Sequence, residues 1–454
     1  MAGAKFRAAT RGQPAALAEI RVRIVGGAAG AVLLVGPGSS GKTTLALDLA
    51  AGLLCHDPDP AARPCRNCRG CRLVESGNHP DLHRLAPGGP GGQVRIGSPS
   101  DPEPGTVRHL IGELALLPAE GGARVAIVEA AHRLNLDSQN ALLKLLEEPP
   151  PGATIVLCAE DEEALLPTVR SRCGRIRLGT AASREIEGWL GDLGAADAPT
   201  AARLARLAGG RPGLALAYSR STDAVRLRGE LARGALDMLA LGRHDRLVAV
   251  REMLKSAAAL DAALAASRGS VASRGGEPAA PVTRRRKGRA AAQPEPMPTM
   301  VQPSPEPAPD AGGTDPDEPE ADAETADEPA AKTPASARRA AAATLLEVFA
   351  NVARDLAVAH AGGARSLRET DLVNEIRAMA PRLDRAAVIR FLDQLNWISG
   401  QADTNLNPEL SLDVLALAWP YDPGAAPAGA SHATAAPASR PADGAATGRS
   451  PSGR

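Results

Sequence analysis

The sequence lacks an excess of charge of either sign. Its 454 residues include 52 basic and 52 acidic side chains, so the formal net charge is zero. A chain without net charge has no overall electrostatic attraction to nucleic acid or to an anionic membrane. Any contact with either would therefore have to be local, through a patch rather than through the whole surface.

Long hydrophobic runs are also missing. The first twenty residues, MAGAKFRAATRGQPAALAEI, contain no apolar core of the kind that a secretion signal needs, and AVLLVG is far too short to cross a bilayer. We therefore expect a cytoplasmic protein with no membrane partner. In a reducing compartment, the six cysteines favour metal ligation or plain burial over disulfide bonds.

The pattern of apolar segments changes along the chain. Within residues 1–178, β-branched runs such as VAIVEA and TIVLCA alternate with helical stretches, which predicts a mostly parallel sheet covered by helices. Residues 179–262 and 339–420 carry helical periodicity only. Between them, residues 263–338 are rich in Ala, Pro, Gly and charge, and such a composition cannot bury enough apolar surface to order itself. We expect disorder there and in the tail at 421–454.

An intact phosphate-binding motif follows the first apolar run. The string GPGSSGKT fits G-x-x-x-x-G-K-[ST] and lies between a strand-like and a helix-like segment, as this motif requires; a glycine-rich turn with a surface lysine is the alternative. Backbone N–H groups would wrap the phosphates, Lys42 would neutralise the β and γ oxygens, and the Thr43 hydroxyl would reach Mg²⁺. We expect ATP with Mg²⁺, or another nucleoside triphosphate, to bind at Gly36, Pro37, Gly38, Ser39, Ser40, Gly41, Lys42, Thr43 and Thr44.

The residue that would help to split ATP is missing. The apolar run at 125–128 should end in an Asp for magnesium and a Glu for water activation, but it is followed by Glu129 and Ala130. Glu129 could still hold a magnesium-bound water, whereas Ala130 cannot polarise anything. Loss of a positioned general base lowers a rate by about 10²- to 10⁴-fold. We expect a chain that binds nucleotide and hydrolyses it poorly or not at all.

Four of the six cysteines cluster between positions 55 and 71. Their spacing, C-x9-C-x2-C-x2-C, contains the tight steps by which thiolates hold tetrahedral zinc. Four reduced cysteines in a loop are the alternative, which is less favourable because exposed free thiols are reactive. We expect a structural Zn²⁺ site formed by Cys55, Cys65, Cys68 and Cys71, and burial of Cys158 and Cys173 in or near apolar strands.

These motifs occur in a familiar order with three further strings, GNHPDLH (77–83), NALLKLLEEPP (140–150) and LLPTVRSRC (165–173). Together they resemble the clamp-loader branch of the AAA+ ATPases, and most of all its delta-prime family from bacterial DNA polymerase III. The resemblance covers roughly residues 10–262. It implies an α/β RecA-like AAA+ domain with a zinc-binding insert, an α-helical lid, and an all-α C-terminal collar domain for oligomerisation. It also implies a role in loading the sliding clamp onto primed DNA during replication, with gamma/tau and delta subunits as partners.

The resemblance also assigns roles to single residues. Arg172 stands in the family's SRC string, whose arginine reaches the nucleotide of the adjacent subunit in trans; a surface arginine in a salt bridge is the alternative. Gln13 matches an element that lies beside the adenine. The position of a polar sensor residue is occupied by Ala159, and that of the lid arginine by Gly213, with Arg211 as a nearby substitute.

Two other functions stay open. A gamma/tau-type ATPase motor would carry the same zinc insert, although its strand normally ends in Asp-Glu. A zinc-bearing scaffold that binds no nucleotide is the second. The basic run RRRKGR at 284–289 could contact DNA phosphates, but a solvated block balanced by the acidic run after it is the simpler interpretation.

Overall fold

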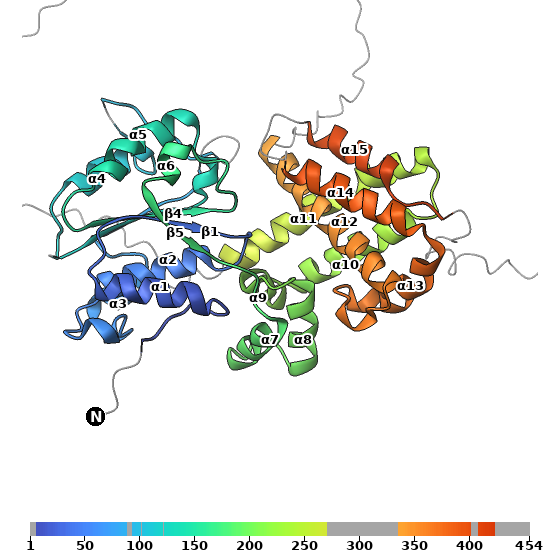
Figure 1. Cartoon of the computed structure of the whole chain (residues 1–454), viewed down its shortest axis with the longest axis horizontal. Helices are drawn as coiled ribbons and strands as arrows, with labels where there is room; N and C mark the ends of the chain where they lie inside the picture. Colours follow the sequence, from blue (N-terminus) through green and yellow to red (C-terminus); the bar gives the residue numbers. More distant parts are fainter. Residues whose placement is uncertain are drawn as a thin grey trace, which may run out of the picture. The chain divides into compact units, whose positions relative to one another are not determined.

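The computed structural model describes residues 6–88, 93–100, 102–120, 122–269, 335–400 and 407–422 (Figure 1). Most of the predicted insert, including the basic run at 284–289, lies outside these residues, and so does the predicted tail beyond residue 422. Among the described helices, none combines the length and the apolar character that a membrane span requires.

Five parallel strands form one sheet in the order β2-β3-β4-β1-β5. They are β1 (Gly30–Val35), β2 (Leu82–Leu85), β3 (Arg124–Val128), β4 (Ala153–Ala159) and β5 (Cys173–Arg177). Every residue of β3 and β4 is buried, which explains why these segments are continuous apolar runs rather than alternating patterns. The parallel α/β sheet that the sequence predicts is confirmed.

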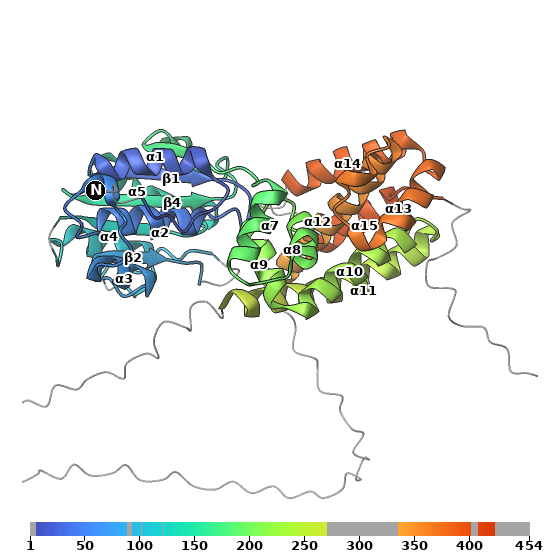
Figure 2. The ribbon, with the colours of Figure 1, turned by 90° about the horizontal axis from the view of Figure 1, so that it is seen from below.

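Helices cover both faces of this sheet (Figures 1 and 2). One face carries α1 (Pro14–Val25), α2 (Lys42–Leu53) and α3 (Arg69–Glu75), and the other carries α4 (Val107–Ala115), α5 (Leu136–Glu147) and α6 (Pro167–Arg170). Alternate residues of β1 serve the two layers, because Val32 and Leu34 belong to the core under α1 and α2, whereas Leu33 belongs to the core under α4 and α5. Two 3-10 helices interrupt the connections, η1 (Pro60–Ala62) and η3 (Ala131–Arg133).

The rest of the described chain is helical and shares one apolar core. Its helices are α7 (Ser183–Asp192), α8 (Ala198–Leu207), α9 (Pro212–Arg220), α10 (Thr222–Asp237), α11 (Arg243–Gly269), α12 (Ala335–His360), α13 (Val373–Met379), α14 (Arg385–Gly400) and α15 (Pro408–Ala418), with 3-10 turns η5 (Ala364–Ser366), η6 (Thr370–Leu372) and η7 (Ala380–Arg382). The rings of Phe349 and Phe391 contact that of Trp419, with centroids 5.1 and 4.6 Å away. The residues expected to form a lid and those expected to form a collar therefore pack around a common centre.

The helices on either side of the predicted disordered insert extend beyond its predicted bounds. Helix α11 continues to Gly269 instead of ending at 262, and α12 begins at Ala335 rather than after 338. Burial of Leu260 and Leu264, one helical turn apart, explains the longer α11 despite its alanine-rich composition. The Thr344 hydroxyl on α12 donates to Asp261 on α11 at 2.5 Å, so the two helices are also joined by a polar contact.

Ion pairs connect the helices that precede residue 269 to those that follow residue 335, and Arg228 and Arg211 form two of them. The guanidinium of Arg228, which is 2% exposed, lies 2.5 Å from the Glu369 carboxylate. Arg211, just before α9, forms a two-pronged pair with Glu347 of α12, with Nη1 and Oε2 2.8 Å apart. Because a buried charge without a partner is costly, these pairs fix which helices pack together.

Candidate functional site

The phosphate loop lies where the sequence places it, between the carboxyl end of β1 and the start of α2. Helix α2 begins at Lys42, so its free backbone N–H groups face the loop that precedes it, an arrangement that favours anions. Gly41 adopts φ 101°, which is a left-handed conformation that side chains disfavour. At Gly36 an added Cβ would lie 2.4 Å from the Leu178 carbonyl oxygen. The loop therefore needs glycine at both positions.

The charged group of Lys42 is held inside this loop. Its Nζ donates to the carbonyl oxygens of Gly36 and Pro37, both at 2.8 Å, and the residue is 9% exposed. Burial lowers the pKa of Lys42, and the nearby Glu160 carboxylate acts in the opposite direction. The Ser40 hydroxyl is buried and has no hydrogen-bond partner in the described part of the chain. An ammonium that binds only carbonyl oxygens and an unpaired hydroxyl both fit a site for an anionic ligand.

An acidic side chain beside the loop was not predicted. Glu160 directly follows β4, and its carboxylate lies 3.0 Å from where a Cβ on Gly38 would stand. The residue thus places a negative charge next to the glycines that would wrap a phosphate. Nothing in the string LCAED shows that Glu160, rather than Ala159, lies beside the loop.

Glu129 follows the carboxyl end of β3, on the same edge of the sheet as the phosphate loop. One of its carboxylate oxygens accepts hydrogen bonds from Arg84 Nε at 3.0 Å and Nη2 at 2.6 Å. A magnesium-bound water would share this carboxylate with the guanidinium of Arg84. Ala130, with φ 52°, has left-handed backbone and turns the chain away into η3.

Gly213, which the resemblance places at the position of a lid arginine, contacts the loop through its backbone, and Arg211 is turned toward α12. The backbone N–H of Gly213 donates to the Ser39 carbonyl at 3.0 Å, and an added Cβ would lie 3.0 Å from that same oxygen. Arg211 is engaged by Glu347 instead of by the loop. The expectation that Arg211 substitutes for the missing arginine is therefore wrong, because its charge is already neutralised on α12.

Arg268 is the arginine that reaches the loop. It lies in the last turn of α11 and its Nη2 donates to the Ser39 hydroxyl at 3.3 Å. Residue 268 falls in the segment predicted to be a disordered insert, so the sequence gives no sign of this contact. Only the extension of α11 brings this residue to the loop.

Gln13 is not open toward a base. Both ends of its side-chain amide are used by Gly179, with Nε2 donating to the carbonyl oxygen at 2.7 Å and the Gly179 N–H donating to Oε1 at 3.1 Å. The pair joins the residue before α1 to the segment that leaves β5. Gln13 is 6% exposed. Its side chain thus holds in place the segment that leads from β5 to the helical region.

The four cysteines predicted to bind zinc come together. Their sulfur atoms all lie within 4.8 Å of one another, with Sγ of Cys55 and Cys68 3.8 Å apart and those of Cys65 and Cys71 4.0 Å apart. A Zn–S distance of about 2.3 Å in tetrahedral geometry separates the sulfurs by about 3.8 Å, so the residues fit Zn²⁺. Burial raises the pKa of Cys68, but the Cys71 and His56 backbone N–H groups and neighbouring thiols outweigh it and lower that pKa to about 6.

Cys158 and Cys173 lie apart from this cluster. Both are buried, as predicted, and burial raises the pKa of Cys158 to about 12 and that of Cys173 to about 11. They are therefore inert thiols that pack as small apolar side chains.

Asp48, on α2, links the phosphate-loop helix to the cysteine segment. Its fully buried carboxylate accepts the N–H groups of Ala9 and Thr10 at 2.9 Å each and the Thr10 hydroxyl at 2.6 Å. The same carboxylate pairs with Arg66, which lies inside the cysteine segment. An aspartate within a helix gives no sequence signal of such a role.

Arg172 lies at the opposite edge of the sheet from the phosphate loop. It immediately precedes Cys173, which pairs with Ala31 at the amino end of β1, whereas the loop follows the carboxyl end of β1. Its Nη2 lies 2.6 Å from Glu147, Nη1 donates to the Thr168 carbonyl at 2.8 Å, and the side chain is 34% exposed. Arg172 is thus in the salt bridge that was the alternative interpretation, and it cannot serve the loop of its own chain from there.

Comparison with known proteins identifies relatives of the α/β part. The family described as DNA polymerase III, delta subunit, matches residues 16–182. The DNA polymerase III subunit delta' of Pseudomonas aeruginosa is 38% identical over 187 residues, covering 40% of this chain and 53% of that protein, and that of Escherichia coli K12 is 36% identical over 177 residues, covering 39% and 50%. The E. coli K12 subunit tau is 34% identical over 148 residues, covering 33% of this chain and 21% of tau.

This chain spans about half the length of the delta' relatives that it matches. Among solved structures, a DNA polymerase III gamma subunit-related protein from Thermotoga maritima aligns over 88% of this chain and 97% of its own, with 16% sequence identity and a TM-score of 0.32. The sequence matches, rather than this structural one, confirm the resemblance of residues 16–182 to the delta-prime subunits of DNA polymerase III.

Replacing Glu160 should strengthen nucleotide binding. Glu160→Gln removes a negative charge beside Gly38, and because exposed charge interactions contribute up to about 1 kcal/mol, we expect roughly three- to fivefold tighter binding of ATP with Mg²⁺. A fluorescent ATP analogue titrated into both proteins measures it. Glu163→Gln is the matched control, since Glu163 pairs with Arg170. Equal affinities for the Glu160 variant and the unaltered chain would contradict a role for this charge.

The cysteine cluster should hold about one zinc ion per chain after purification without chelators. Elemental analysis measures the metal, and Cys68→Ser should lower its content and loosen the segment around residues 55–71, because metal binding is coupled to local folding. Cys158→Ser is a control that leaves the zinc content unchanged. Four freely titratable thiols in a metal-free chain would exclude the site.

Proposed function

We propose that this chain, whose residues 16–182 are similar to the delta-prime subunits of DNA polymerase III, is a delta-prime-type subunit of the clamp-loader complex of that polymerase. Its α/β part would be an AAA+ nucleotide-binding domain of RecA-like topology, and its helices from α7 onward would supply a lid and an oligomerisation collar. With gamma/tau and delta subunits, it would help to place the sliding clamp on primed DNA. The similarity to delta' subunits carries this proposal.

The loop supports binding of ATP with Mg²⁺. Lys42 and Thr43 stand at the start of α2, where a γ-phosphate and its metal would lie, and Arg268 reaches Ser39 from α11. Turnover is a different matter, because Ala130 provides no base and Glu129 is bound by Arg84. The proposed role of nucleotide is therefore to stabilise the subunit, and hydrolysis takes place on partner subunits.

A gamma/tau-type motor is the competing function, favoured by the match to tau. The purified chain should bind ATP and hydrolyse it barely above background, with or without primed DNA, while Lys42→Ala should weaken binding because it removes the phosphate counter-charge. A nucleotide-binding titration and a phosphate-release assay measure both properties. Robust turnover by the unaltered chain alone would favour the motor, and absence of binding would favour a zinc-bearing scaffold.

Arg172 is proposed to act on the nucleotide of a neighbouring subunit. Its position at the edge remote from its own loop supports this role, and its exposed pair with Glu147 is weak enough to exchange for a phosphate. Arg172→Ala should leave assembly and ATP binding by this chain intact, yet lower DNA- and clamp-stimulated ATP hydrolysis by the complex, by about 10³-fold or more at the affected site.

The matched control for this variant is Arg170→Ala, which removes a guanidinium two residues away that pairs with Glu163. Arg172→Lys should rescue poorly, because a point charge does not reproduce the planar fork of arginine. Normal clamp loading by a complex verified to contain Arg172→Ala would show that the residue is only part of a surface salt bridge.

A further inference from the structure

A pocket of about 450 Å³ opens in the helical region, and none of its described lining residues belongs to the phosphate loop. It lies between the start of α7, the end of α8 and the segment that follows α12. Four arginines line it: Arg206 from α8, Arg354 from α12, and Arg365 and Arg368 from the segment after α12. A cavity of this volume is large enough for a ligand of nucleotide size.

The positive charge of this pocket is not balanced. The described lining contains no carboxylate, and the exposed guanidinium groups of Arg206 and Arg365 form no hydrogen bond or ion pair with any described residue. Arg368 donates to the neutral Asn351 amide oxygen at 2.5 Å. Only Arg354 has a carboxylate partner, the buried Asp355 beneath the pocket, at 2.8 Å. The guanidinium groups of Arg206, Arg365 and Arg368 therefore line one pocket without an ion-pair partner in the described part of the chain.

The arginines also act on one another. Burial lowers the pKa of Arg368, the positive charge of Arg354 lowers it further, and Asp355 acts in the opposite direction. Such crowding of like charges raises the free energy of the unliganded protein. A bound anion would relieve it.

Neutral donors complete the wall. Ser183 and Ser366 also line the pocket, and α7 begins at Ser183 behind Ala182, which has no side-chain oxygen to cap the helix. The positive dipole end of α7 therefore lies at the same cavity that the arginines line, and the Glu185 carboxylate of the first turn accepts the Ala182 N–H there at 3.4 Å.

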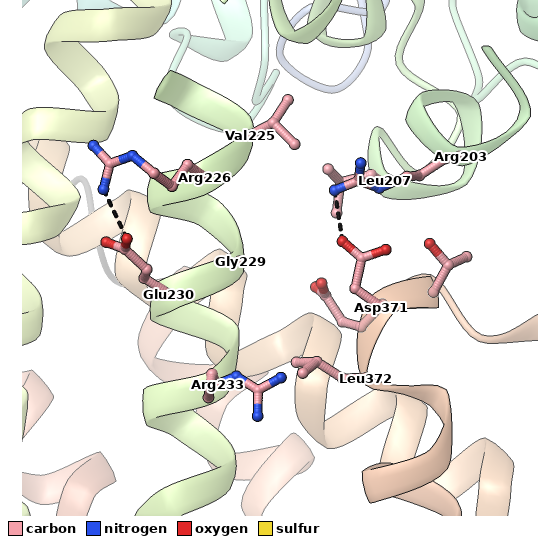
Figure 3. A pocket seen from close by; sticks show the side chains of 11 residues that line it. Arg203, Leu207, Val225, Arg226, Gly229, Glu230, Arg233, Asp371 and Leu372 are labelled. Atoms are coloured by element: carbon pink, nitrogen blue, oxygen red, sulfur yellow. Dashed lines mark hydrogen bonds and ion pairs between the residues drawn. The ribbon is translucent and has the colours of Figure 1, made fainter. Parts of the chain in front are cut away.

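In a neighbouring pocket, by contrast, the positive charges of the arginines are balanced by carboxylates. It measures about 280 Å³ and contains three arginines, but also Glu230, Glu369 and Asp371 (Figure 3). Arg203 pairs with Asp371 at 2.5 Å and Arg226 with Glu230 at 2.7 Å, and Figure 3 shows both pairs within the pocket wall. Arg203 and Arg226 are therefore already engaged in ion pairs.

We propose that the pocket formed by Arg206, Arg354, Arg365 and Arg368 binds a phosphate group. Guanidinium forks match the oxygens of phosphate, and the described lining contains no aromatic ring on which a base could stack. The ligand is therefore recognised by its phosphate, either a diester of a nucleic-acid backbone or free phosphate. This site is separate from the phosphate loop and does not depend on the function proposed above.

The test uses the full chain and the double variant Arg206→Ala/Arg365→Ala, whose side chains are exposed and unpaired, so that equal melting temperatures are expected. One arm measures fluorescence anisotropy of a short labelled oligothymidine without terminal phosphates. The other arm titrates inorganic phosphate calorimetrically in a Lys42→Ala background, in which the phosphate loop no longer contributes. We expect the double variant to lose about tenfold or more in affinity in at least one arm, and a loss with oligothymidine should come with a shallower salt dependence.

The matched control is Arg203→Ala/Arg226→Ala, which removes the same charge from the balanced pocket and should change affinity less than about twofold. A loss confined to the first arm identifies the diester as the source of the phosphate, and a loss confined to the second identifies free phosphate. Unchanged affinity of the Arg206/Arg365 variant in both arms, or an equal loss in the control, would overturn the proposal.

Discussion

Burial of both faces of the parallel sheet is the constraint on which the rest of the α/β part depends. Every residue of strands β3 and β4 is buried, and apart from Arg124 and Thr154 their side chains are apolar, so most polar groups lie beyond the strand ends. In a parallel sheet these ends meet at one edge. The phosphate loop, Glu129 and Glu160 are therefore neighbours because of the sheet, and their side chains compete for the same small region.

That competition determines what the loop can do. Lys42 supplies the one ammonium, Glu160 offsets it, and Arg84 occupies Glu129. A loop with this balance has the backbone geometry that favours a phosphate, and the carboxylate at the end of β3 is paired with Arg84. Arg268 adds positive charge from a helix outside the sheet, so the charge at the loop depends on how far α11 extends.

Features encoded by contiguous residues could be predicted from the sequence. The GPGSSGKT loop, the cysteine spacing and the apolar strands each depend on local order, and each stands where predicted. Glu160, Arg268 and the Gln13–Gly179 pair could not be predicted, because each acts through a residue distant in sequence. Arg211 was misjudged for the same reason, since its proximity to Gly213 in sequence says nothing of Glu347, which takes its charge.

The Asp48 carboxylate makes the cysteine segment and the phosphate-loop helix parts of one cooperative unit. It is fully buried, and it is shared by the N-terminal segment and Arg66. If the cysteine segment opens, Arg66 is withdrawn and the carboxylate is left with less compensation in a dry environment. Local unfolding of the cysteine segment therefore also destabilises α2. Amide hydrogen exchange in the cysteine segment and in α2 should be correlated. Occupancy of the cysteine site by a metal would then change the stability of α2, without any contact between metal and nucleotide.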